Sequence, residues 1–175
     1  MKKKINPYKA TALGLSGIAA AGASAVYGGT RFLLDIALNS KPPKIYDKIS
    51  HLLSGENDEE RREGKNTILN NAANKLSGTE METVSTTSFD GLELKARFYK
   101  CENPKRIVVC CHGWRSSAGN DFGVSMDFMH DNECDILFID QRAQNESTGK
   151  YMGFGTIERF DCQTWVNWVN DNTEE

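Results

Sequence analysis

Two continuous apolar runs, RIVVCC at residues 106–111 and DILFID at residues 135–140, constrain the fold of this chain more than any other feature. Runs of this length without polar alternation are typical of parallel strands that are buried on both faces. Between them, Phe122, Met126 and Met129 recur at helical spacing and predict a helix with one core face. Alternating strands and helices therefore predict an α/β fold with parallel strands joined by right-handed crossovers.

The segments on either side of these runs extend the pattern. ETVSTTS, rich in Thr and Val, predicts a strand. Asp90-Gly91 predicts a hairpin turn, and residues 92–99 alternate as a half-exposed strand does. Apolar residues then define one face of a last predicted helix: Ile157, Phe160, Trp165, Trp168 and Val169.

The first forty residues have a different composition. Lysines come first, a run of about twenty uncharged residues follows, and residues 10–38 contain only Arg31 and Asp35 as charges. A single-pass transmembrane anchor is the favoured interpretation, with the N-terminus in the cytoplasm and the bulk of the chain outside. Two alternatives stay open. Ala23-Ser24-Ala25 fits a signal-peptide cleavage site, which would give a secreted protein, and the Ala/Gly face would also suit a soluble packed helix.

Residues 39–80 have the composition of a helical linker. Pro42-Pro43 end any helix that continues from the first segment. Apolar residues recur at helical spacing before and after a charged block, which predicts two short amphipathic helices. The chain is therefore predicted to have three parts, at residues 1–38, 39–80 and 81–175. The two apolar sets are Ile45, Ile49, Leu52 and Leu53, then Ile68, Ala72 and Leu76.

Charge and cysteine content exclude several functions. The net charge is −3, and no basic run predicts a nucleic-acid partner. The five cysteines form no CxxC pair and no metal-ligand spacing, so neither a metal nor a cofactor is predicted. Buried free thiols are favoured over disulfides or zinc. Neighbouring Cys110 and Cys111 are expected on opposite faces of their strand.

Four segments, in order, resemble a known family: SFDGLELKARFY, IVVCCHGWRSS, DILFIDQRAQNESTGKYMGFG and ERFDCQTWVNWV. Residues 81–172 resemble the amino-terminal half of the α/β-hydrolase fold. The similarity is greatest to membrane-anchored bacterial hydrolases related to acyl-aminoacyl peptidases, lipases and esterases. The resemblance implies a small ester or peptide substrate. It also implies the strand order 1-2-4-3, with a fifth strand beside the third.

The resemblance also assigns the loop after the third strand. In this family His-Gly opens the loop, and the backbone N–H of the next residue, here Trp114, donates to the oxyanion. Preorganised donors of this kind stabilise developing negative charge. Gly113 allows the backbone to turn without a Cβ clash. His112 is assigned a loop-supporting role rather than proton transfer.

The segment DQRAQNEST is similar to the family's Asp-x-Arg-x-His-Gly-x-Ser turn after the fourth strand. Asp140, Arg142 and Ser147 match it and are expected to support the loop. Gln144 and Asn145 stand where His and Gly are usual. Because Asn tolerates a left-handed backbone, the turn is expected to survive.

The hydrolase mechanism needs a nucleophilic serine in a Gly-x-Ser-x-Gly elbow, followed by an acid and a histidine. The resemblance places all three beyond residue 175. The partial match at Gly123-Val124-Ser125 lies inside a predicted helix, so Ser125 is not assigned as a nucleophile, and Asp161 is not assigned as the acid. The chain of 175 residues is therefore expected to be inactive alone. Two hypotheses remain, the front part of a membrane-anchored serine hydrolase and a non-catalytic, membrane-tethered binding protein derived from one.

Overall fold

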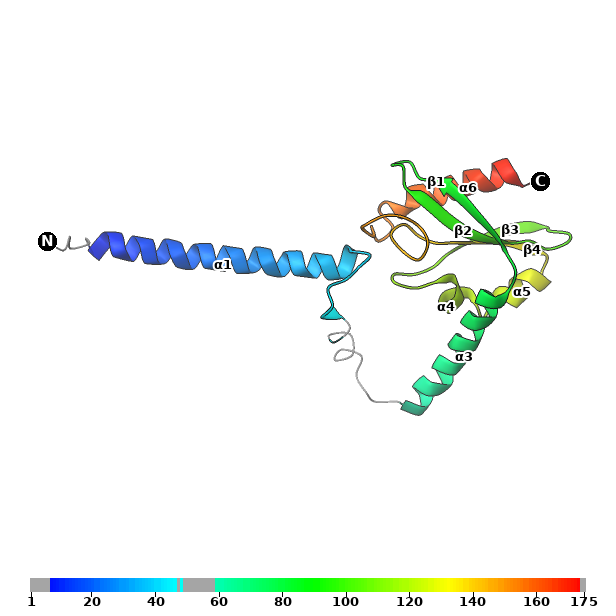
Figure 1. The fold of residues 1–175 in the computed structure, drawn as a ribbon, viewed down its shortest axis with the longest axis horizontal. Helices are drawn as coiled ribbons and strands as arrows, with labels where there is room; N and C mark the ends of the chain where they lie inside the picture. Colours follow the sequence, from blue (N-terminus) through cyan, green and yellow to red (C-terminus); the bar gives the residue numbers. More distant parts are fainter. Residues whose placement is uncertain (1–6, 47, 49–58, 174–175) are drawn as a thin grey trace. The chain divides into compact units, whose positions relative to one another are not determined.

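The computed structural model describes residues 7–46, 48 and 59–173, without the side chains of residues 7–20, 59–62 and 65. The chain divides into two compact units after Leu38, and each is described by itself. Figure 1 shows the elements of both units. His51 and most of the first predicted amphipathic helix of the linker lie outside the described residues.

The first unit is one helix, α1, Pro7–Leu38. Within the described part of the chain, no helix combines the length and apolar character that a membrane span needs. The predicted transmembrane anchor is therefore not supported. From residue 21 onward, the helix is rich in Ala and Gly and also carries Arg31 and Asp35. The lysines at residues 2–4 lie outside the described residues.

The second unit contains a four-stranded sheet with strands β1 (Glu82–Thr87), β2 (Glu93–Tyr99), β3 (Arg106–Cys111) and β4 (Cys134–Ile139). Their order in the sheet is β1-β2-β4-β3, which confirms the predicted order of the first four strands. β3 and β4 are parallel, whereas β2 is antiparallel to both β1 and β4, so the sheet is mixed. The predicted Asp-Gly hairpin joins β1 to β2, with Gly91 at a φ of 85°.

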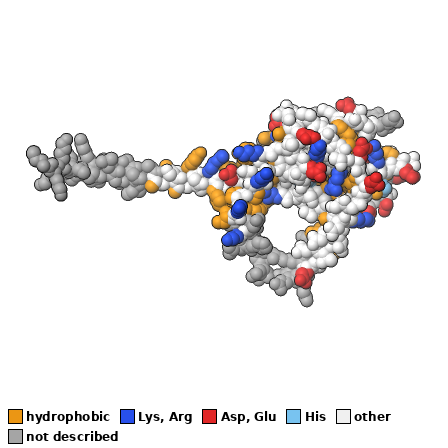
Figure 2. Space-filling model, viewed as in Figure 1, with side chains coloured by type: hydrophobic (Ala, Val, Ile, Leu, Met, Phe, Trp, Pro, Cys, Tyr) orange, Lys and Arg blue, Asp and Glu red, His pale blue; other side chains and the backbone are white. Residues whose placement is uncertain are grey.

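Helices cover both faces of this sheet (Figure 1). Helices α3 (Glu59–Gly78), α4 (Ala118–Phe122) and α5 (Met126–Asp131) lie on one face, where Leu76 and Met126 pack against Cys110, Ile136 and Phe138. Helix α6 (Glu158–Asn172) lies on the other face, where Trp165 packs against Leu94, Phe98, Leu137 and Ile139. Figure 2 shows acidic and basic side chains interspersed on the visible face of the sheet unit.

Two helix predictions need correction. The helix predicted through Phe122 and Met129 is two helices, α4 and α5, separated at Gly123. A Cβ at Gly123 would lie 2.8 Å from the Ala72 carbonyl oxygen, so this segment approaches α3 too closely for a side chain. In α6, the predicted core residue Phe160 is 42% exposed.

The amino-terminal end of α6 instead buries two carboxylates, those of Glu158 and Asp161. They are buried because each binds polar groups of the neighbouring loops, as described below. Ile157 precedes the helix and is 36% exposed, which is the second departure from the predicted apolar face.

The two apolar runs differ in burial. Every residue of β4 is buried, as predicted. In β3 only Cys110 is fully buried, and Ile107, Val108 and Val109 are half-buried. The reason is position, because β3 is the last strand of the described sheet and has a neighbour on one side alone.

Candidate functional site

His112 follows the last residue of β3 and is buried, with 1% of its surface exposed. Its Nδ1 lies 2.9 Å from the Gly113 carbonyl oxygen, and its Nε2 accepts a hydrogen bond of 3.2 Å from the Gln141 N–H. An Nε2 that accepts and an Nδ1 that faces a carbonyl require the tautomer with the proton on Nδ1. Gln141 Nε2 in turn donates to the His112 carbonyl. His112 therefore joins the loop after β3 to the loop after β4.

Asp121 holds the same loop from the side of α4. Its Oδ2 accepts a 2.6 Å hydrogen bond from the Gly113 N–H, and its Oδ1 accepts a 2.6 Å bond from Ser116 Oγ. Hydrogen bonds to an ionised carboxylate are stronger than hydrogen bonds between two neutral groups. Sequence reasoning did not identify Asp121, because its short helix gives no periodic signal.

Trp114 comes next and belongs to an aromatic group at the surface of this loop. Its ring is stacked on Phe154 at 6.0 Å between centroids and meets the edge of Tyr46 at 6.4 Å. The guanidinium of Arg115 lies 5.2 Å from the Trp114 ring centroid and 5.1 Å from that of Tyr46. Two members of this group, Trp114 and Phe154, line a cavity of about 250 Å³ together with His112, Gly113, Gln144 and Met152 among others.

The turn after β4 has the geometry that its sequence predicts. Ser147 Oγ donates to the Asp140 carbonyl at 2.6 Å and accepts from the Lys95 N–H at 2.8 Å. Asn145, at the position where glycine is usual, has a φ of 50°. The turn thus survives because asparagine adopts the left-handed conformation, as predicted.

Gln144 and Asn145 also bind the loop after β3. Gln144 Oε1 accepts a 2.7 Å hydrogen bond from the Arg115 N–H. Asn145 Nδ2 lies 3.0 Å from His112 Nε2 and donates to the Ser116 carbonyl at 3.2 Å. The two positions that depart from the family pattern therefore supply contacts between the two loops of the site.

Asp140 directly follows β4, at the start of the turn that contains Gln144 and Asn145. Its Oδ2 accepts a 3.2 Å hydrogen bond from the Glu146 N–H. Burial raises the pKa of the Asp140 carboxyl above its ordinary value, and the hydrogen bond from Glu146 opposes part of this effect.

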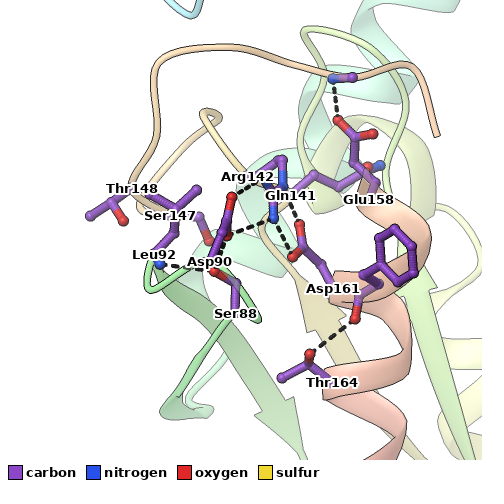
Figure 3. Close-up of polar contacts among 12 residues, drawn as sticks. Ser88, Asp90, Leu92, Gln141, Arg142, Ser147, Thr148, Glu158, Asp161 and Thr164 are labelled. Carbon is purple, nitrogen blue, oxygen red and sulfur yellow. Dashed lines mark hydrogen bonds and ion pairs between the residues drawn. The ribbon is translucent and has the colours of Figure 1, made fainter. Parts of the chain in front are cut away.

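Arg142 is the centre of a buried ionic network, drawn in Figure 3. Its Nε and Nη2 donate to Asp161 at 2.6 and 2.7 Å, and its Nη1 and Nη2 donate to Asp90 at 2.9 and 3.1 Å. The hydrogen bonds that Arg142 donates to Asp161 raise the pKa of Arg142, and the hydrogen bonds that it donates to Asp90 lower the pKa of Asp90. The network joins the β1–β2 turn, the turn after β4 and α6.

Glu158 performs a similar role for the next loop. Its two carboxylate oxygens accept hydrogen bonds of 2.5 Å from the Gly153 N–H and 2.8 Å from the Gly155 N–H. This carboxylate therefore holds the segment that presents Phe154 to the cavity. Neither Glu158 nor the partners of Arg142 could be assigned from sequence, because the contacts join separate elements.

The rejected candidates lie elsewhere. Ser125 precedes α5, and its Oγ donates to the Phe122 carbonyl at 3.1 Å. The Asp161 carboxylate accepts two hydrogen bonds from Arg142.

No family model matches this sequence, and no curated protein matches it. Among solved structures, a Pyrococcus furiosus esterase is 28% identical with a TM-score of 0.49, and the match covers 57% of this chain and 38% of the esterase. An α/β hydrolase from Penicillium is 15% identical with a TM-score of 0.48, and the match covers 54% of this chain and 34% of that one. An Exiguobacterium antarcticum esterase is 16% identical with a TM-score of 0.42, and the match covers 50% of this chain and 31% of the esterase. The chain thus spans less than two fifths of each.

The strand order, the mixed sheet with helices on both faces, and the two loops at its carboxyl end together define an α/β-hydrolase-like fold. The solved structures reported above are esterases and α/β hydrolases. The similarity to these structures covers about half of this chain.

Proposed function

We propose that residues 81–172 are the amino-terminal part of a serine hydrolase that acts on small ester or peptide substrates. The main support is the loop after β3, where His112 and Asp121 hold both sides of Gly113. These contacts position the backbone directly before Trp114, whose N–H we assign as a donor to the oxyanion. A donor positioned before the reaction stabilises the developing charge without reorganisation.

The other residues of the site have supporting roles in this proposal. His112 and Gly113 shape the oxyanion loop, and Asp140 and Arg142 hold the turn beside it. The serine, acid and histidine are proposed to lie in sequence that follows residue 175, because the 175 residues contain no Gly-x-Ser-x-Gly segment. The DNA beyond codon 175 tests this directly, since an open frame should encode an apolar strand and such a segment.

The corresponding enzymatic prediction compares two polypeptides. The chain of residues 1–175 should not hydrolyse nitrophenyl acetate detectably above the buffer rate, because it lacks an assigned nucleophile and any acceleration of water attack by the oxyanion loop alone should be undetectable. A longer protein that includes the serine elbow should hydrolyse it, and the activity should disappear when the elbow serine is changed to alanine. Initial rates measured by absorbance are sufficient.

Two outcomes would contradict the proposal. Turnover by residues 1–175 that disappears in Ser125→Ala would identify Ser125 as the nucleophile. An inactive longer protein with an intact fold would favour the alternative, a binding protein derived from a hydrolase.

We further propose that the protein is located at a membrane with its sheet unit outside the cytoplasm. The support is the order of lysines and uncharged residues at the N-terminus. The full chain expressed in bacteria should then sediment with membranes, and a chain that starts at Lys41 should not. Recovery of the intact full chain in the soluble fraction would contradict this location. A shorter product that begins at Val26 would indicate signal-peptide cleavage.

A further inference from the structure

Cys111 and Cys162 lie on facing surfaces of β3 and α6. Successive side chains of a strand point to opposite faces of the sheet. Because Cys110 packs in the core on the side of α5, Cys111 points to the side of α6. On α6, Cys162 lies one turn after Glu158 and three residues before Trp165, both of which are buried. Cys162 therefore belongs to the face of α6 that meets the sheet.

The two thiols also share one cavity. A cavity of about 280 Å³ is lined by Cys111 and Cys162 together with Ile139, Gly155, Arg159 and Trp165, among others. The Cys162 thiol also contributes to the raised pKa of Cys111, as expected for two thiols that line the same cavity. Cys111 is exposed and Cys162 is partly exposed, so a small reagent can reach the pair from solvent.

We propose that Cys111 and Cys162 are an oxidative modification site, at which a small-molecule disulfide converts the two free thiols into an intramolecular disulfide. In the first step the Cys111 thiolate attacks the reagent, and one reduced thiol leaves. In the second step the Cys162 thiolate attacks the mixed disulfide at the sulfur of Cys111, and a second reduced thiol leaves. The protein loses two electrons and two protons, which the reagent gains as two thiols.

The bond would connect two parts of the candidate site. Cys111 is the residue before His112, and α6 carries Glu158 and Asp161, which hold the neighbouring loops. A cross-link between β3 and α6 would therefore fix the loop after β3 to the helix that supports the other loops. Because the bond restricts the unfolded chain, the oxidised protein should melt at a higher temperature than the reduced protein.

The rate of oxidation should depend strongly on pH. Residue Cys111 is open to solvent on one side, but partial desolvation of its thiol in the cavity, with the neighbouring Cys162 thiol, raises the pKa of Cys111 to about 12. The thiolate is the reactive form, so its fraction and the rate should rise about tenfold for each unit of pH between pH 7 and 9. For a thiol of ordinary pKa, the rate would instead level off near pH 9.

The experiment treats the full chain with oxidised glutathione, alkylates the remaining thiols and maps the peptides without reduction. We expect one cross-link, between Cys111 and Cys162, with Cys101, Cys110 and Cys134 alkylated. Phenylarsine oxide, which binds two thiols with loss of water, should bind once to the reduced chain. Cys162→Ser should abolish both results. Cys110→Ser is the matched control, since it changes the adjacent thiol on the opposite face and should preserve both.

Three results would overturn the proposal. They are separate glutathione adducts on Cys111 and Cys162 without a cross-link, a cross-link that joins other cysteines, and a Cys111–Cys162 cross-link that forms at the same rate in urea. The first would show that the thiols do not meet, and the last would show that the fold does not bring them together. Because the wild-type chain is tested with two reagents, a variant that fails to fold does not prevent a decision.

Discussion

Replacing Asp161 with alanine is expected to lower the free energy of unfolding by about 3–5 kcal/mol, as does the loss of one partner from other buried ion pairs. The variant would leave the Arg142 guanidinium, whose side chain is 4% exposed, without the carboxylate that binds it through two hydrogen bonds. Urea denaturation followed by tryptophan fluorescence measures the change, because Trp165 and Trp168 lie on the same helix.

The matched control for this change is Asp90→Ala. Asp90 binds the same guanidinium, but its side chain is 40% exposed, so water can replace part of the contact. Its removal should therefore destabilise the protein less than that of Asp161. Equal losses in the two variants would contradict the view that burial decides the strength of this network.

The pH dependence of the Asp90 variant has a defined sign. The pKa of Asp90 is lowered in the folded protein, chiefly by its hydrogen bond with Arg142. Its stabilising contribution is therefore complete above the pKa of an unfolded aspartate and is lost as pH falls through the lower folded pKa. The stability difference between wild type and Asp90→Ala should decrease across this acidic range.

Replacing Leu76 with alanine is expected to lower the free energy of unfolding by about 2–5 kcal/mol, the usual cost of a large cavity in a core. Leu76 lies in α3 and is completely buried against the sheet, in the cluster that contains Met126 and Phe138. The predicted linker therefore contributes to the core of the sheet unit. Thermal or urea unfolding of the second unit measures the loss.

Ile68→Ala is the control within the same helix. Ile68 is 62% exposed, so its truncation should change stability by no more than about 0.5 kcal/mol. An equally small loss of stability in Leu76→Ala and Ile68→Ala would contradict this view. It would show that α3, residues 59–78, does not contribute to the stability of the core.

The apolar patterns of the sequence by themselves predicted the strands. The resemblance to the α/β-hydrolase fold predicted their order in the sheet. Leu94, Ala96 and Phe98 alternate along β2 and are buried, because a strand with one core face imposes a period of two. The apolar run of β4 is buried throughout, because it pairs with a strand on each side and has helices over both faces. The left-handed backbone conformation of Asn145 was also predictable, because it depends mainly on local steric contacts.

Only the tertiary structure decided which polar residues meet. Arg142, Asp90 and Asp161 come from three separate elements, and each alone has the composition of a surface charge. Tertiary contacts also divided α4 from α5, because Gly123 approaches the backbone of α3. They placed Glu158 and Asp161, rather than Ile157 and Phe160, on the buried face of α6, because those carboxylates bind loop amides and Arg142. Apolar periodicity predicts which residues leave water, whereas the satisfaction of buried charges depends on partners that the chain brings together only when it folds.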